Sequence, residues 1–126
     1  MDRREPFSYK KRIKAFKYAG RGFALLAAYE HNFRIHLFAA LIAVVLGFLL
    51  SVSITEWCLI ILCIGGVLTA EALNTSLEVL CDRVTKNQDT LIGKAKDIAA
   101  AGVTFTALAA LIVGILIFLP KLLLLF

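Results

Sequence analysis

The sequence has few cysteines, and their pattern excludes a disulfide framework. The three cysteines are Cys58, Cys63 and Cys81, and none belongs to a CxxC pair. All three fall within one apolar segment that is predicted to be helical. An odd number of cysteines in such a segment is not the pattern of a disulfide-stabilised protein. We therefore interpret them as small buried hydrophobic residues, which is the usual behaviour of a free cysteine.

Several familiar sequence signals are also absent. Residues 1–36 carry nine lysines or arginines spread among aromatic residues, whereas a secretory signal peptide has a short charged start followed by an apolar core. There is no Walker A motif, no GxGxxG, no zinc-ligand spacing and no readable Ser–His–Asp order. Internal repeats and low-complexity segments are not evident. We therefore expect no signal peptide, and these common motifs do not explain the function.

Apolar residues, in contrast, are abundant. Of the 126 residues 60% are hydrophobic, and the mean hydropathy of +0.85 is too high for a soluble protein of this length. We therefore expect one small integral-membrane domain over residues 1–126. The net charge is +5. Because anionic headgroups attract basic segments, we expect these charges to face a cytoplasmic membrane surface and to fix the topology, and we expect no nucleic-acid partner.

Periodicity and apolar runs predict an all-α fold with four helices. Residues 8–30 place aromatic and aliphatic residues on one face and basic residues on another, which is typical of an amphipathic helix in the membrane interface. Residues 33–53, 54–82 and 98–119 are apolar and long enough to span a bilayer, which requires roughly 20 residues. We expect Trp57 to anchor the second span at the interface and Pro120 to end the third.

The distribution of positive charge predicts the orientation of these spans. Nine lysines or arginines precede the first long apolar run, and none lies between Ile35 and Ile54. Because cytoplasmic loops carry an excess of lysine and arginine, we expect the N-terminus and the 82–97 loop in the cytoplasm, and the SVSITE turn and the C-terminus outside. The cations of the second loop are Arg83, Lys86, Lys94 and Lys96.

A row of polar residues lies near the far end of the second span. Glu71, Asn74, Glu78 and Asp82 follow one another at steps of three, four and four, so they share one helical face. At about 1.5 Å per residue, Glu71 lies about 21 Å beyond Trp57, still within a hydrocarbon core of roughly 30 Å. A carboxylate there costs on the order of a few kcal/mol. It is therefore expected to have a partner, and a structural contact between helices is the simpler alternative.

The loop after this row favours a phosphate-binding function. Lys94, Lys96 and Asp97 precede the third span, where lysines commonly only extend to the interface. Opposite Glu78 and Asp82, the lysines are also suited to neutralise phosphate oxygens while the acids hold a metal. Mg²⁺ typically takes one or two carboxylates together with phosphates.

Three polar residues lie near the start of the first span. Glu30 ends the predicted interfacial helix at the cytoplasmic level and is a further candidate metal ligand. His31 and His36 have no evident metal partner in the sequence. We interpret both histidines as interfacial polar residues.

The polar row resembles a known family signature. EALNTSLEVLCD at residues 71–82 resembles the signature of the prokaryotic diacylglycerol kinase family, whose members are small integral-membrane lipid kinases. FKYAGRGF, EHNFRIH, ITEW and AKDIAAAGV also resemble this family. The segments FKYA, ExNxxIH, TEW and FLPK are most similar to its Gram-positive branch, the undecaprenol kinases. The resemblance covers residues 16–121.

The resemblance implies both an assembly and an activity. The implied assembly is a homotrimeric helical bundle in the bacterial cytoplasmic membrane, with three transmembrane helices, an N-terminal amphipathic helix and sites shared between subunits. The implied reaction, which requires Mg²⁺, transfers the γ-phosphate of ATP to undecaprenol and gives undecaprenyl phosphate for cell-envelope synthesis. Diacylglycerol as the acceptor, giving phosphatidic acid, is the alternative within this class.

The resemblance also implies residue roles. Glu71 is implied to be the general base, Asn74 to position the reacting groups, and Glu71 together with Arg34 to contact the lipid. Glu30 and Glu78 are implied to hold Mg²⁺. The nucleotide-binding residues that it implies are Tyr18, Glu30, Glu78, Asp82, Lys96 and Asp97. The sequence departs from the family pattern at KNQDTLIG (residues 86–93), where Asn87, Gln88 and Asp89 replace an acidic-aromatic-His-Pro run.

Two other classes of function remain as alternatives. A small proton-coupled transporter also carries intramembrane acids, but it predicts acids near the bilayer centre and no need for Lys96 or Glu30. A structural membrane anchor leaves Glu71 and Asn74 unexplained.

Overall fold

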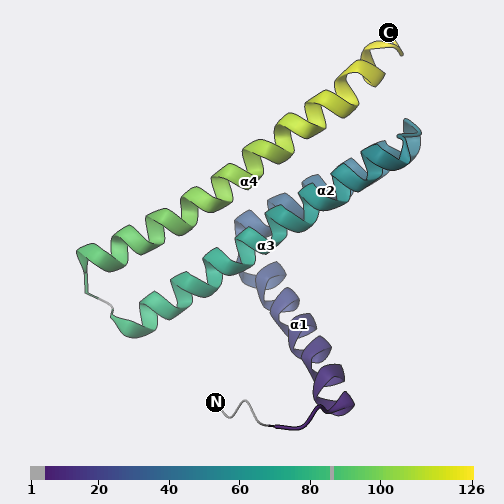
Figure 1. Ribbon diagram of the computed structural model, residues 1–126. Coiled ribbons are helices and arrows are strands. Elements are labelled where there is room, and N and C mark those ends of the chain that lie inside the picture. The colour runs from purple at the N-terminus through teal and green to yellow at the C-terminus, as the bar shows by residue number, and fades with distance from the viewer. Residues whose placement is uncertain (1–4, 86) are drawn as a thin grey trace.

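The part of the chain that the structure describes forms four helices joined by short connections (Figure 1). The computed structural model describes residues 5–85 and 87–126, and within these ranges every regular element is helical. In chain order the helices are α1 (Tyr9–Tyr29), α2 (His31–Leu49), α3 (Ile54–Val84) and α4 (Thr90–Leu123). The predicted all-α fold is therefore confirmed. Lys86, one of the loop cations named above, lies outside the described residues.

The last three helices are long and apolar enough to cross a membrane, and their number agrees with the three predicted spans. Figure 1 shows α3 and α4 running in opposite directions, with α2 beside α3. The α2–α3 turn and the C-terminus lie at one end of this bundle, and the α3–α4 connection lies at the other. At the first end Val52, Ile60, Ile117 and Phe118 form the buried core cluster.

α1 leaves the bundle at an angle (Figure 1). Its first turn is capped by Ser8, whose Oγ accepts a hydrogen bond from the backbone N–H of Lys11 at 3.4 Å. The helix ends where Glu30 adopts an extended backbone. The rings of Phe23 and Phe33 meet edge to face at 5.6 Å and join α1 to α2. None of the α1 residues is buried, and the position of this helix in the membrane interface stays a prediction.

The turn between α2 and α3 is set by local hydrogen bonds and one close contact. Ser53 Oγ accepts from the backbone N–H of Glu56 at 3.1 Å, and Glu56 Oε1 accepts from the N–H of Ser53 at 2.9 Å. This reciprocal capping box starts α3. Gly47 allows α2 to approach the indole of Trp57, since a Cβ at Gly47 would lie 2.5 Å from Trp57 Cη2. The residue expected to be an interfacial anchor therefore also packs the two helices together.

α4 is longer than the predicted third span, 98–119. It begins at Thr90 because Asp89 Oδ1 accepts from two backbone N–H groups of the first turn, at 2.9 and 3.1 Å. The prediction that Pro120 ends this helix is wrong, because Pro120 lies inside it. Proline has no N–H to donate, but the carbonyl of Pro120 still accepts a hydrogen bond from the N–H of Leu124 at 3.3 Å. The last turn of α4 therefore forms beyond the proline.

The three long helices differ in length, and this difference determines where the ends of α3 and α4 lie relative to the start of α2. α2 has 19 residues, α3 has 31 and α4 has 34. At about 1.5 Å per residue they are roughly 28, 46 and 51 Å long. Only the length of α2 is close to a hydrocarbon core of roughly 30 Å. The far ends of α3 and α4 therefore extend beyond the start of α2, where α1 departs.

The predicted burial of the cysteines is correct for one of the three. Cys81 is buried, Cys63 is half-buried and Cys58 is exposed. The prediction is wrong for Cys58, which lies on an exposed face of α3. An apolar residue on that face of a spanning helix is covered by lipid and needs no protein contact.

Candidate active site

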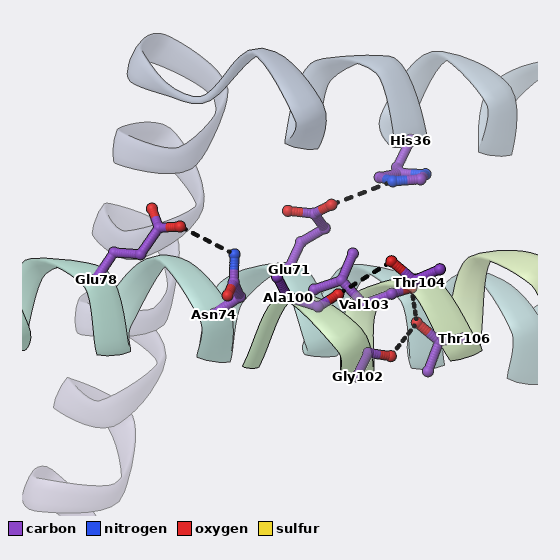
Figure 2. Close-up of polar contacts among 9 residues, drawn as sticks. All are labelled: His36, Glu71, Asn74, Glu78, Ala100, Gly102, Val103, Thr104 and Thr106. Atoms are coloured by element: carbon purple, nitrogen blue, oxygen red, sulfur yellow. Dashed lines mark hydrogen bonds and ion pairs between the residues drawn. The ribbon is translucent and has the colours of Figure 1, made fainter. Parts of the chain in front are cut away.

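Glu71 is the buried acid of α3. Only 3% of this residue is exposed, and it is the one buried charged side chain among the described residues. Figure 2 shows it projecting from α3 toward α2, where Glu71 Oε1 lies 3.1 Å from His36 Nε2. The two groups are close enough to form an ion pair when His36 is protonated. They are not aligned as a hydrogen bond, so Glu71 Oε1 has no hydrogen-bond partner.

The sequence predicts that His36 is an interfacial polar residue, and the structure adds a contact with Glu71 that the sequence analysis does not predict. The positions of His36 and Glu71 along their helices indicate that the two residues can meet. His36 lies 13 residues before the end of α2, and Glu71 lies 17 residues after the start of α3. At about 1.5 Å per residue, both lie roughly 20–25 Å from the turn that joins these antiparallel helices. Residues at one level of adjacent helices can meet, provided that they face each other.

One and two turns farther along α3, Asn74 and Glu78 form a second polar group. Asn74 Nδ2 donates to Glu78 Oε1 at 3.4 Å, and Asn74 Oδ1 is buried without a hydrogen-bond partner. Figure 2 shows both side chains projecting from the same face of α3 as Glu71. The shared face predicted from the spacing of these residues is therefore observed for all three.

The oxygen atoms of this second group suit a hard cation. Among the described residues, no three His, Cys, Asp or Glu side chains are grouped closely enough to enclose a metal ion. Mg²⁺ does not require such a group, because it takes one or two carboxylates while phosphates and water fill its other positions. The half-buried Glu78 carboxylate and the unpartnered amide oxygen of Asn74 therefore fit Mg²⁺ that is carried by a phosphate ligand.

The third polar group closes the far end of α3 against the start of α4. Lys96 Nζ lies 2.7 Å from Asp82 Oδ1. The pair borders a polar hollow of about 770 Å³ that the α3–α4 connection also lines.

The atypical loop contributes to this hollow in two ways. Asn87 and Gln88 are exposed and line it. Asp89 also lines it, but one oxygen of its carboxylate caps α4. Asp89 therefore has a local structural role in addition to its place at the hollow. Asp97 is exposed on the following turn of α4.

The predicted site residues Tyr18, Glu30 and Arg34 form no hydrogen bond or ion pair with these three polar groups in the described part of the chain. Tyr18 is 60% exposed on α1, and Arg21 Cζ lies 5.6 Å from its ring centroid. Glu30 is half-buried at the α1–α2 junction. Arg34 Nη2 lies 3.0 Å from Nδ1 of His31, also near the start of α2. Across the described chain, none of the three predicted residues forms an ion pair or side-chain hydrogen bond with the acids of α3.

An apolar groove runs along α2, α3 and α4 from the level of His36 toward the opposite end of the bundle. Its volume is about 610 Å³. Apart from His36 and Cys63, every residue that lines it is apolar. The hydroxyls near this region of α4 add no free donor, because Thr104 and Thr106 bond to carbonyls of their own helix (Figure 2). His36 is therefore where the groove meets the polar row of α3.

The three polar groups together can act on a hydroxyl at membrane depth. Glu71 can accept a proton from a hydroxyl that arrives along the apolar helices. Glu78 lies seven residues farther on, or about 10 Å along the helix axis. Lys96 and Asp82 lie beyond it at the polar end. A base inside the apolar layer, beside a cation-rich and metal-compatible end, suits the transfer of a phosphoryl group to a lipid.

Comparisons with known proteins agree with this chemistry. Residues 17–118 match the family model described as prokaryotic diacylglycerol kinase. The chain is 45% identical over 110 residues to the undecaprenol kinase of Bacillus subtilis, covering 87% of this chain and 89% of that protein. It is 33% identical over 100 residues to the diacylglycerol kinase of Escherichia coli K12, covering 79% and 82% respectively. The chain belongs to the prokaryotic diacylglycerol kinase family.

Proposed function

We propose that this protein is an ATP-dependent lipid kinase that transfers the γ-phosphate to the hydroxyl of undecaprenol. The observation that carries this proposal is the burial of Glu71 among apolar helices, with 3% of the residue exposed. A lipid alcohol brings its hydroxyl to that depth, whereas a water-soluble acceptor does not. The 45% identity to an undecaprenol kinase supports undecaprenol as the acceptor.

Glu71 is the proposed general base. As the lipid oxygen forms its bond to the γ-phosphorus, the hydroxyl proton passes to the carboxylate of Glu71. The bond from the γ-phosphorus to the bridging oxygen breaks, and the products are the lipid phosphate and ADP. Asn74 lies between Glu71 and Glu78 and positions the reacting groups. Arg34, at the start of α2, contacts the lipid near its polar end.

The polar hollow beside Lys96 and Asp82 is the proposed site of ATP. Lys96 contributes a fixed positive charge toward the phosphates, and we place Asp97 and Tyr18 at the nucleotide as well. Glu78 and Glu30 would hold Mg²⁺, which neutralises phosphate charge when it is bound. Because phosphoryl transfer depends mainly on positioning and charge stabilisation, these residues need only hold the nucleotide in line with the hydroxyl.

The apolar groove offers the hydrocarbon chain of the acceptor a surface that begins at His36. A lipid chain in the groove would bring its hydroxyl to the end where Glu71 lies. Undecaprenol and diacylglycerol both present apolar chains to such a surface. The groove therefore supports a lipid acceptor, and the choice of undecaprenol depends on the comparison with the Bacillus subtilis protein.

We also propose a homotrimer in the bacterial cytoplasmic membrane. The N-terminus and the 82–97 loop would face the cytoplasm, where ATP is available, and the C-terminus would lie outside. The amphipathic α1 would lie in the cytoplasmic interface. The basic residues of α1 and the departure of this helix at the start of α2 support that arrangement.

A direct transfer assay tests the function. Purified protein in bicelles receives Mg²⁺ and ATP labelled at the γ-phosphate, and either undecaprenol or diacylglycerol is offered. We expect label in the extracted undecaprenyl phosphate at a rate well above that for diacylglycerol. Greater label in phosphatidic acid would support diacylglycerol as the acceptor, as in the Escherichia coli relative. Label in neither lipid would refute the proposed kinase and would reopen the transporter alternative.

A further inference from the structure

The contact between His36 and Glu71 is the strongest feature that the proposed function leaves unused. We propose that His36 is a positioning residue for Glu71: its Nε2–H holds Glu71 Oε1, so that the second carboxylate oxygen is directed at the acceptor hydroxyl. This inference deepens the proposed function and rests on it.

The burial of the carboxylate is the first reason. A buried charged oxygen without a hydrogen bond is costly, and Glu71 Oε1 is such an atom. Its nearby potential donor is His36 Nε2 at 3.1 Å. Donors and acceptors in an active site are often poorly aligned before the substrate binds and align in the complex. A small rotation of either side chain is enough to complete this hydrogen bond.

The direction of the carboxylate is the second reason. Figure 2 shows one oxygen of Glu71 facing His36 and the other pointing away from it, toward Asn74 and Glu78. The imidazole of His36 contacts the Glu71 oxygen that lies on the groove side. The other oxygen is left on the side where the proposed metal and phosphates lie, which is where a base must meet the hydroxyl during transfer.

The position of His36 in the groove is the third reason. It lines the apolar groove, and its side chain is only 25% exposed. A hydroxyl that reaches Glu71 along the groove must pass the imidazole. His36 therefore contacts both the path of the lipid and the base, whereas His31 pairs with Arg34 at the helix start.

Two substitutions test the role in the labelled-ATP assay. In His36→Leu, which keeps the bulk and loses the donor, we expect kcat for undecaprenol to fall about 100-fold, as expected for a misplaced catalytic group. The KM for ATP should stay within about twofold, because the nucleotide end is separate. His36→Gln supplies an amide N–H near the place of Nε2 and should keep kcat within about tenfold of the unmodified protein.

The outcomes separate the inference from the proposed function. A kcat for His36→Leu near that of the unmodified protein, while Glu71→Gln is inactive, would overturn the inference and leave the kinase intact. An equal loss in His36→Leu and His36→Gln would also overturn it, because donation would not be the cause. If His36→Leu does not assemble, His36→Gln decides: retention within tenfold supports the role, and a 100-fold loss refutes it.

A spectroscopic test does not depend on turnover. The chain has two histidines, so His31→Gln leaves His36 as the single imidazole. We expect its ring ¹⁵N signals to change when Glu71→Gln is added and to stay unchanged when Glu56→Gln is added in the first turn of α3. Unchanged signals with Glu71→Gln would overturn the inference even if the protein phosphorylates no lipid.

Discussion

Replacement of Glu71 by glutamine is the sharpest test of the proposed chemistry. The amide has nearly the same size as the carboxylate and still offers an oxygen to His36 Nε2. It is a very poor proton acceptor, however, and it carries no charge. We therefore expect Glu71→Gln to fold and assemble as the unmodified protein does, and to lose most of its turnover.

The size of the loss follows from the position of the other acids. A positioned general base contributes about 10²- to 10⁴-fold to a rate. Glu78 is the next carboxylate on this face, about 10 Å farther along the axis, and Asp82 is paired with Lys96. Neither can reach a hydroxyl at the level of Glu71. The whole 10²- to 10⁴-fold contribution of the base to kcat should therefore be lost, which corresponds to about 2.7–5.5 kcal/mol in activation free energy.

The assay measures kcat and the KM for each substrate with undecaprenol, Mg²⁺ and labelled ATP, together with ATP binding and assembly. We expect kcat to fall at least 100-fold while the affinity for ATP changes little, because Lys96 and Asp82 are untouched. A kcat within tenfold of the unmodified protein would show that Glu71 is not the base. Loss of assembly would show that the Glu71 carboxylate is structural.

Three further substitutions examine the nucleotide end and the packing. Glu78→Gln should weaken ATP binding at least tenfold in the presence of Mg²⁺ and hardly at all in its absence, as measured by nucleotide titration; equal weakening in both conditions would argue against a metal role. Lys96→Met should raise the KM for ATP about tenfold with little change in thermal stability, because an exposed ion pair such as Lys96–Asp82 contributes little to stability; an unchanged KM would remove this lysine from the site. Gly47→Ala should lower the free energy of unfolding by about 1–3 kcal/mol, because the new Cβ would lie 2.5 Å from Trp57 Cη2. In thermal unfolding, Gly65→Ala is the matched control, since a Cβ there meets no atom within 4 Å.

Much of the fold was predictable from the sequence because a membrane imposes simple rules. A spanning segment must satisfy its backbone hydrogen bonds within itself, so apolar runs of sufficient length had to be helices. The helix ends were less predictable. The start of α4 depends on the capping carboxylate of Asp89, and Pro120 lies inside that helix because a proline still accepts through its carbonyl.

The candidate site also has a part that was predictable from the sequence and a part that was not. Local spacing placed Glu71, Asn74 and Glu78 on one face, because residues three and four apart on a helix are neighbours. The partners across helices were not predictable by that rule. Lys96 was expected to face phosphate, and the structure pairs it with Asp82. The roles of Tyr18, Glu30, Arg34 and Asp97 stay predictions, since these residues act through a ligand or a second subunit if they act as proposed.

The sequence by itself determined the helical membrane architecture and the acidic face of α3, because both follow from periodicity and hydropathy along one segment. Only the tertiary structure decided that His36 meets Glu71, with 3.1 Å between His36 Nε2 and Glu71 Oε1. That contact depends on the rotation of α2 and α3 about their own axes. The two helices pack closely near the turn that joins them, where Gly47 approaches Trp57, and no local pattern near His36 or Glu71 specifies their rotation.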